Sequence, residues 1–440
     1  MQKVQFFGAA GGVTGSCNLL IGEHTQILID LGMFQGIDDK NGINASPLAF
    51  DVTAISAVLV THAHLDHCGR LPLLIKNGFK GKVYTTQATK DIVAVSLLDS
   101  AGIAQENGLL LYTPQDVEEL VSLIEVVDYN QPFKVGEYDI NFKNAGHILG
   151  SASIEISNNE TIVFSGDLGN TPEDLIPATE YISKADFVVM ESTYGDSSHP
   201  EGDASQTIQN EINEVEKNGG VLLIPAFAIE RTQEVLHIIG HLKQKGLVKN
   251  ETPVYLDSPL ALEVTEIFKK YPNLYNQSTF KESSPFDFSN LNIIETFKQS
   301  KSIIKDRGPK IIIAGSGMLT GGRILQHLKN YISLPTTRLL MVGYQAVNTL
   351  GRELEEGAKQ IAINEAVLSV RAVVTKIDSL SSHADLPKLL TWLKHIQGIK
   401  KVFINHGEIN QRNSLAEKIK TETEIKNVEL PEMNQIFELV

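Results

Sequence analysis

The chain has 440 residues, of which 42% are hydrophobic and 21% charged, and its formal net charge is −15. This length exceeds one ordinary hydrophobic core, so we expect a globular protein with two domains. No apolar run approaches the ~18–20 residues that span a bilayer, and no continuous apolar segment precedes Cys17, so we expect a cytoplasmic protein with no membrane partner. Cys17 and Cys68 are the only cysteines; two are too few for a thiolate zinc site, and we expect both to be small buried residues.

The negative charge bears on the class of partner. Phosphate binding normally requires a basic surface, so the charge argues against tight, sequence-independent coating of a nucleic acid. A local basic groove on an acidic body remains compatible with it.

The first part of the chain alternates short apolar strands with helices. Strands are expected at 26–31, 55–60, 82–85, 138–142, 152–156, 161–165 and 187–190, and helices at 86–98 and 114–125. Thr113 is the expected N-cap of the second helix, with Pro114 at its first helical position.

The pattern then becomes regularly α/β. Helices are expected at 205–217, 230–245, 261–271 and 321–331, strands at 221–225, 254–256, 310–314 and 339–342, and an irregular polar stretch at 273–292. This alternation predicts a parallel sheet with helices on both faces. From residue 366 onward the chain returns to the first style, with an extended segment at 366–377, a helix at 386–396, a strand at 401–404, and a terminal helix and strand. The sequence therefore predicts a parallel α/β module that interrupts another domain.

The most informative stretch is Thr61-His62-Ala63-His64-Leu65-Asp66-His67, which directly follows an apolar strand. Side chains two apart in an extended chain point the same way, so we expect His62, His64 and Asp66 to converge and His67 to join them as the chain turns. Imidazole and carboxylate groups suit Zn²⁺ or a similar divalent ion. Four ligand-type residues exceed one tetrahedral site with an open position, so the pattern indicates two metals. The alternative is a surface loop that happens to be rich in histidine.

Further ligand-type residues lie beside glycines after other expected strands. They are His147 in Ala145-Gly146-His147, Asp167 in Ser165-Gly166-Asp167 and His406 in Asn405-His406-Gly407. Singly, each is typical of a turn, but beside the histidine-rich stretch they favour a shared metal site. Asp30 ends an apolar run, and we interpret it either as a carboxylate that orients a ligand histidine or as a turn or cap residue.

These motifs resemble those of the metallo-β-lactamase superfamily and, within it, the β-CASP nucleases that process RNA, such as polyadenylation endonucleases and ribonuclease J. Asp30, 62–67, His147 and Asp167 match the four superfamily motifs in order, and Glu191, His383 and His406 match the β-CASP motifs. The resemblance covers essentially the whole chain. It implies an αββα sandwich with an inserted parallel α/β domain, here 192–365, between parts of the sandwich at 1–191 and 366–440.

The resemblance also implies the ligand sets and the reaction. One zinc would take His62, His64 and His147, the other would take Asp66, His67 and His406, and Asp167 would bridge the two. The expected activity is two-metal hydrolysis of phosphodiester bonds in single-stranded RNA, leaving a 5′ phosphate. His406 favours RNA because the DNA-repair members typically lack a histidine at this motif.

The resemblance suggests how protons move. Asp66 or Asp167 would orient the attacking water, and His383 would donate a proton to the leaving 3′ oxygen. Glu191 would hold His383 in the right tautomer and raise its pKa. The alternative for His383 is a cap ahead of the helix at 386–396.

Candidate RNA contacts lie in the expected insertion. The glycine-rich loop at 314–323 contains Ser316 and Gly317, whose backbone amides can cradle a phosphate, and Arg323 adds positive charge. Arg231 is a second candidate at a helix start. A purely structural turn is the alternative. Ser382 and Glu230 stand where relatives usually have alanine and glycine.

Two other functions are compatible with the metal motif. One is hydrolysis of a small thioester or lactam, although enzymes that open β-lactams commonly have cysteine at the position of Asp167 and lack the insertion. The other is a non-catalytic RNA-binding homologue, against which the full ligand set argues. The oligomeric state is left open, with a homodimer as one option.

Overall fold

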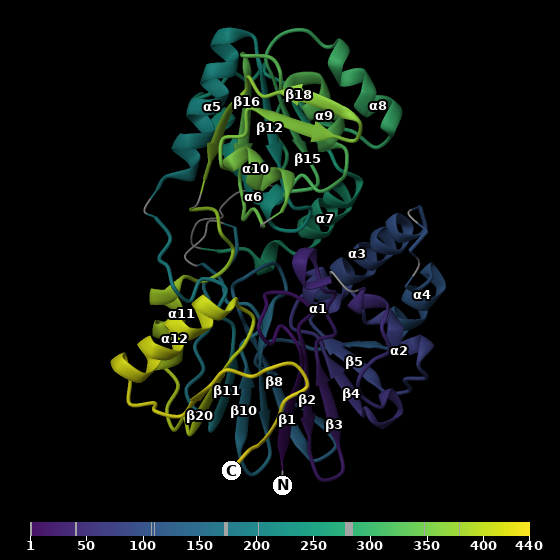
Figure 1. Cartoon of the computed structure of the whole chain (residues 1–440), viewed down its shortest axis with the longest axis vertical. Coiled ribbons are helices and arrows are strands. Elements are labelled where there is room, and N and C mark those ends of the chain that lie inside the picture. The colour runs from purple at the N-terminus through teal and green to yellow at the C-terminus, as the bar shows by residue number, and fades with distance from the viewer. Residues whose placement is uncertain are drawn as a thin grey trace. The chain divides into compact units, whose positions relative to one another are not determined.

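The computed structural model describes all residues except 1, 40–41, 107, 110, 171–174, 201, 278–284, 347 and 378. The chain divides into two compact units (Figure 1). Unit 1 contains Met1–Ser198, Asn273–Gln277 and Ser382–Val440, and unit 2 contains His199–Pro272 and Ser278–Ser381. The domain division at 191/192 and 365/366 stays a prediction; the compact units change over at somewhat later residues. Among the described residues, no helix has the length and apolarity needed to cross a membrane.

Unit 1 is built on two seven-stranded sheets. The first has the order β22-β1-β2-β3-β4-β5-β6. Its strands are β22 (Ile436–Glu438), β1 (Lys3–Gly8), β2 (Cys17–Ile21), β3 (Gln26–Ile29), β4 (Ala57–Leu59), β5 (Lys82–Thr85) and β6 (Ile124–Val126). The second has the order β21-β20-β11-β10-β9-β8-β7. Its strands are β21 (Val428–Glu429), β20 (Lys401–Ile404), β11 (Phe187–Met190), β10 (Thr161–Phe164), β9 (Ala152–Ser157), β8 (Tyr138–Asn144) and β7 (Phe133–Val135).

The two sheets share one apolar core, which contains Phe6 and Ile27 from the first sheet and Phe142 and Phe403 from the second. Side chains alternate along a strand, so a strand covered on both sides is apolar throughout. Strand β11 shows this, because Phe187 and Val189 belong to the core between the sheets while Val188 and Met190 belong to the core under the outer helices.

Helices cover both sheets. The second sheet is covered by α11 (Leu386–Lys394) and α12 (Ile409–Glu422), and α1 (Leu65–Cys68), α2 (Pro72–Lys76), α3 (Gln87–Glu106) and α4 (Pro114–Ser122) lie on the side of the first sheet (Figure 1). Thr113 caps α4 through a capping box with Asp116, as the sequence predicts. The expected αββα sandwich is confirmed.

Unit 2 is a six-stranded sheet with the order β14-β13-β15-β12-β16-β19, in which every neighbouring pair is parallel. Its strands are β14 (Leu291–Ile293), β13 (Val254–Asp257), β15 (Lys310–Ala314), β12 (Val221–Pro225), β16 (Thr337–Met341) and β19 (Val373–Lys376). Its helices are α5 (Ala204–Asn218), α6 (Arg231–Gln244), α7 (Pro259–Lys270), α8 (Phe297–Ser302), α9 (Ile324–Tyr331) and α10 (Leu350–Glu355). The expected parallel α/β module is confirmed.

The main difference from expectation concerns the segment at 366–377, which we expected to rejoin the first domain. Instead β18 (Ala366–Ser369) pairs with β17 (Gln360–Ile363), and β19 pairs in parallel with β16. The apolar side chains of Leu368, Val370 and Val374 pack on the core of unit 2, which keeps the segment there. Residues 278–284 of the expected irregular stretch lie outside the described part of the chain.

Candidate metal centre

The histidine-rich stretch leaves β4 extended and then turns into a helix. His64 is the N-cap residue of α1, with φ −67° and ψ 144°, and the helix begins at Leu65. Asp66 therefore does not converge with His62 and His64, contrary to the expectation from an extended chain. It lies instead with His67 in the first turn of α1.

The ligand-type residues form two groups, each with its ligand atoms within 4.8 Å of one another. The first group is His62, His64, His147 and Asp167, and the second is Asp66, His67, Asp167 and His406. These side chains come from positions far apart in sequence, at the ends of β4, β8, β10 and β20. The two groups contain the residues that the family resemblance assigns to the two zinc ions, and their role as ligands stays a prediction.

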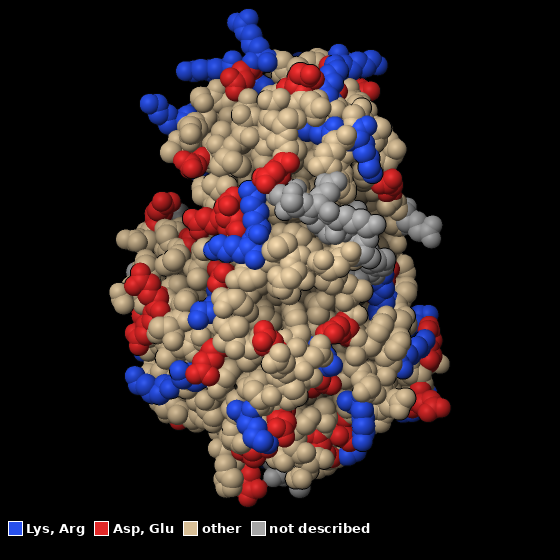
Figure 2. Space-filling view, turned by 180° about the vertical axis from the view of Figure 1, so that it is seen from behind, with Lys and Arg blue, Asp and Glu red and all other residues tan. Residues whose placement is uncertain are grey.

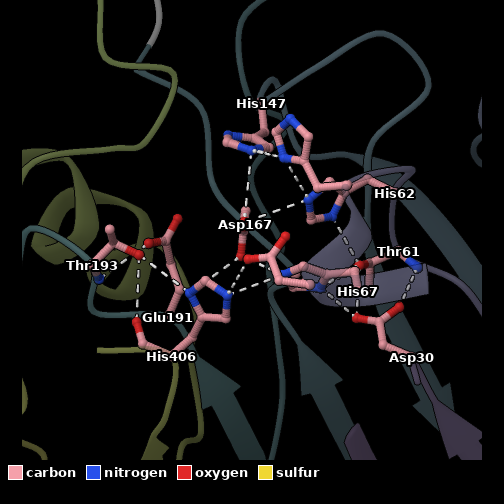
Figure 3. A network of polar contacts seen from close by, with 12 residues as sticks. Asp30, Thr61, His62, His67, His147, Asp167, Glu191, Thr193 and His406 are labelled. Carbon is pink, nitrogen blue, oxygen red and sulfur yellow. Dashed lines mark hydrogen bonds and ion pairs between the residues drawn. The ribbon is translucent and has the colours of Figure 1, made fainter. Parts of the chain in front are cut away.

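Asp167 faces both groups (Figure 3). Its Oδ2 lies 3.4 Å from His62 Nε2 and 3.6 Å from His147 Nε2. Its Oδ1 lies 3.2 Å from His67 Nε2 and 3.7 Å from His406 Nδ1. One carboxylate oxygen thus points toward each group, which is the geometry of a bridging ligand.

The protonation of the three histidines in the first group suits cation binding. Burial is the main cause that lowers the pKa of His62 and of His147 well below 6.5, and it lowers the pKa of His64 to about 4. Neutral imidazoles keep a lone pair for a metal. Burial would raise the pKa of Asp167, but the nearby His406 and His67 hold it well below its usual range. The first group therefore presents neutral nitrogens beside an ionised carboxylate. In the second group, burial would lower the pKa of His67, but the charges of Asp167 and Asp30 raise it well above 6.5.

Hydrogen bonds on the far side fix how three of the imidazoles point. His67 Nδ1 lies 2.7 Å from Asp30 Oδ2, and His147 Nδ1 lies 3.0 Å from the carbonyl oxygen of Ser382. Thr193 Oγ1 lies 3.2 Å from His406 Nδ1. When Nδ1 of His67 and His147 donates, Nε2 faces the cluster with its lone pair. Because Ser382 acts through its backbone, its departure from the usual alanine leaves this contact unchanged.

The residues present fit a metal. Both oxygens of Asp167 are buried and make no hydrogen bond to any other described residue. A buried ionised carboxylate without hydrogen bonds costs several kcal/mol, whereas cations placed among its neighbouring nitrogens would satisfy it. The cluster is therefore a candidate metal-binding centre.

His383 and Glu191 lie beside the first group. His383 Nδ1 lies 3.2 Å from each oxygen of Glu191 and 3.9 Å from Asp167 Oδ2. Glu191 also accepts hydrogen bonds from the backbone N–H groups of Leu168 and Thr193. Burial would lower the pKa of His383, but the carboxylates of Glu191 and Asp167 raise it to about 9. The helix cap that we considered for His383 is instead Asp385, whose side chain accepts from Lys388 N.

The four candidate RNA-contact residues lie in unit 2, where several are already engaged. Arg323 donates to Asp257 Oδ1 and to two backbone carbonyls, and Arg231 pairs with Glu234. Ser316 Oγ accepts from the amides of Thr320 and Gly321. Gly317 leaves no room for a side chain, because a Cβ atom would lie 2.8 Å from the Phe227 ring. Their role in RNA binding stays a prediction.

Sequence reasoning missed Thr61, whose hydroxyl contacts Asp30 and two of the candidate ligand histidines. Thr61 Oγ1 donates to Asp30 Oδ2 at 2.8 Å and lies 3.1 Å from His62 Nδ1 and 3.3 Å from His67 Nδ1. Its position directly before His62 was the only signal in the sequence.

Comparison with known proteins extends this picture. Three domain models match: a metallo-beta-lactamase superfamily domain at 19–193, a Beta-Casp domain at 232–354, and a Zn-dependent metallo-hydrolase RNA specificity domain at 367–431. Ribonuclease TTHA0252 of Thermus thermophilus is 37% identical over 92% of this chain and 93% of its own length. The RNase J-like protein of Methanocaldococcus jannaschii is 33% identical over 94% and 95%. Transcription termination factor FttA of Methanosarcina mazei is 32% identical over 96% and 70%.

Proposed function

Since the chain belongs to the β-CASP group of the metallo-β-lactamase superfamily, we propose that it is a zinc-dependent ribonuclease. It would hydrolyse phosphodiester bonds of single-stranded RNA and leave a 5′ phosphate. The observation that carries the proposal is the pair of ligand groups that share Asp167. Two cations about 3.5–4 Å apart suit an in-line displacement at phosphorus, and a histidine-rich, cysteine-free ligand set suits zinc.

The reaction divides between the cations and the side chains. Bound cations would activate the attacking water and neutralise charge that develops on the phosphoryl oxygens. Asp66, whose pKa is lowered to about 2, remains ionised and can orient that water. Burial alone would raise the pKa of Asp66, but the hydrogen bond from His406 and the charges of His67 and His406 lower it.

His383 is suited to supply the proton. With a pKa of about 9 it is protonated near neutral pH, and its side chain is 22% exposed, so a substrate can reach it. Glu191 accepts a hydrogen bond from Nδ1 of His383. The proton on Nε2 is then the one that His383 would donate to the leaving 3′ oxygen. Glu191 is in turn held by two backbone amides, which fix its carboxylate in place.

RNA is favoured over a small substrate for two reasons. The RNA specificity domain model covers 367–431, and two of the similar relatives are named as ribonuclease or RNase J-like. The buried Asp167 stands where a lactam-opening enzyme commonly has cysteine. A cytoplasmic location and a homodimer stay predictions.

The test uses end-labelled single-stranded RNA, double-stranded RNA and matched DNA, incubated with zinc-loaded protein. We expect cleavage of the single-stranded RNA with 5′ phosphate ends. A β-lactam and a glutathione thioester serve as competing substrates. If the thioester or the lactam is turned over efficiently while the RNA survives, the protein is a small-substrate hydrolase.

A further inference from the structure

A short exposed segment of unit 2 has a charge opposite to that of the whole chain. The ten residues from Lys298 to Arg307 contain four basic residues and one acidic residue, whereas the chain has 53 acidic and 38 basic residues. The acidic residue, Asp306, accepts a hydrogen bond from the hydroxyl of Tyr255 at 2.7 Å. We define Lys298, Lys301, Lys305 and Arg307 as the basic patch.

The local structure presents these cations to solvent. Helix α8 is capped by a box between Thr296 and Gln299 and continues into a 3₁₀ turn at Ile303–Lys305. Only Ser300 and Ile303 of this stretch face inward, Ser300 by donating to Asp257 Oδ2 at 2.5 Å and Ile303 as a buried side chain. The four basic residues are all exposed. In Figure 2, lysine and arginine side chains stand out at the end of unit 2 that lies at the top of the view.

The basic patch differs from several exposed lysines of unit 1, which have acidic partners. Lys82, Lys134, Lys394 and Lys418, all in unit 1, form ion pairs with Glu125, Asp139 and Glu422. No residue of the basic patch forms an ion pair with any described residue. Four cations without an ion pair among the described residues, in a ten-residue segment whose four basic residues outnumber its one acidic residue, favour a polyanionic ligand.

Exposed apolar side chains lie among these cations. Phe297 and Ile304 are each 49% exposed, and Lys301 Nζ lies 4.5 Å from the centre of the Phe297 ring. The spacing of 297, 301 and 304 places the three side chains on one helical face. A large aromatic ring between lysines is the combination that binds single strands, because a base stacks on the ring while the lysines contact phosphates.

We propose that the basic patch, together with Phe297, is an RNA-binding surface of unit 2, separate from the residues already considered for RNA contact. It would hold the backbone of single-stranded RNA and stack one base on Phe297. This inference rests on the proposed function. It explains how a chain with a net charge of −15 retains a long RNA without a basic surface overall.

The test compares a variant in which Lys298, Lys301, Lys305 and Arg307 are all replaced by glutamine with a matched control. The control replaces Lys82, Lys134, Lys394 and Lys418 by glutamine, which changes the net charge by the same amount. Both sets are made in a zinc-loaded His383→Ala background, so that RNA survives during binding. Affinity for a long single-stranded RNA is measured by fluorescence anisotropy over a range of salt concentrations.

We expect the basic-patch variant to lose affinity by about ten-fold or more at low salt, and the slope of log K against log salt to fall by up to about 3, since each phosphate contact with a single strand contributes about 0.7. The control should keep the slope of the parent. Phe297→Ala should weaken binding by about five-fold or more, and Phe297→Tyr should restore it. With His383 present, cleavage of a dinucleotide should be unchanged in the basic-patch variant, while KM for the long RNA rises.

An unchanged affinity and slope in the basic-patch variant, with the long RNA still cleaved normally, would overturn this inference and leave the proposed function intact; an acidic protein would then be the better partner. Equal losses in both four-residue variants would show a general charge effect and also overturn it. If the unmodified protein neither binds nor cleaves RNA, the proposed function itself fails.

Discussion

At the scale of single residues, the hydroxyl of Thr61 supports the metal centre without facing it. It donates to Asp30, which in turn contacts Nδ1 of His67. Thr61→Val keeps the shape of the side chain and removes the donor, so we expect zinc affinity to fall by about 10–100-fold. Competition with a chromogenic chelator measures this.

A matched control is Thr85→Val, because Thr85 is also fully buried but donates only to the carbonyl of Val60. Equal zinc affinity in the Thr61→Val variant and in the unmodified protein would show that the Thr61 hydroxyl does not support zinc binding.

His383 is proposed to donate a proton and not to bind zinc, so its replacement should affect the rate alone. His383→Ala should leave zinc content unchanged and lower the rate by about 10²–10⁴-fold, the usual range for general acid catalysis. RNA with a 3′-bridging sulfur at the scissile bond should recover most of this loss, because a thiolate leaves without a proton. If the variant stays equally slow on the sulfur substrate with zinc bound, His383 is not the acid.

Glu191→Gln should reduce the rate as well. The structure adds a cost that the sequence did not show, since both oxygens of Glu191 accept from backbone amides and a glutamine NH₂ would oppose one of them.

At the scale of elements, a buried network in unit 2 joins β13 to α8 and α9. Asp257 is fully buried and accepts from Arg323, His327 and Ser300 at 2.7, 2.6 and 2.5 Å. Asp257→Asn places an NH₂ against one of these donors, so we expect unit 2 to lose about 3 kcal/mol of unfolding free energy. Denaturant unfolding followed by circular dichroism measures it. The exposed Asp287→Asn is the control, with a loss below about 1 kcal/mol.

The same network predicts how the stability of unit 2 changes with pH. Burial would raise the pKa of Asp257, but the hydrogen bonds from His327, Ser300 and Arg323 lower it. The ionised form therefore stabilises the fold above the unfolded pKa of about 3.9, and this contribution disappears as the pH falls through the lower folded pKa. The difference between the unmodified protein and Asp257→Asn should narrow below about pH 4. A difference that stays constant down to about pH 3 would contradict the assignment.

Strand and helix positions were predictable where a strong apolar period or a cap marked them. Strands β5, β11, β12, β15 and β20 have the expected bounds, and Thr113 caps α4. Strands β1 and β2 were not foreseen, because the glycines between and beside them hide the alternation. Strand β19 was expected in the first domain, and only its pairing with β16 places it in unit 2.

The site was predictable because its residue types are rare together and its motifs occur in order along the chain. The turn at His64 was not predictable, since spacing alone did not show that α1 begins at Leu65. Thr61 and the carbonyl of Ser382 were missed, because a hydroxyl or a backbone oxygen carries no metal-ligand signature.

At the scale of the whole molecule, the metal centre ties segments of unit 1 that are far apart in sequence, from His62 to His406. Removing zinc should therefore lower the melting temperature of unit 1. Trp392 is the only tryptophan; it belongs to α11 and its side chain packs in the core of unit 1, so its fluorescence reports this unit. No metal site is expected in unit 2, and its calorimetric transition should stay in place.

A chelator saturated with zinc beforehand is the control for this experiment. An unchanged Trp392 transition after verified zinc removal would contradict the long-range tie. Equal shifts of both transitions would show a general effect of the chelator.

The most direct test of the central claim is a zinc titration of the apoprotein, with cleavage of single-stranded RNA as the readout. We predict that activity rises to a break at two zinc ions per chain and then stays level. In Asp167→Asn, zinc binding and cleavage should fall together, since the oxygen that faces one of the two groups is lost. Full cleavage without metal, a break at one ion per chain, or no cleavage of RNA with both sites filled would contradict the account.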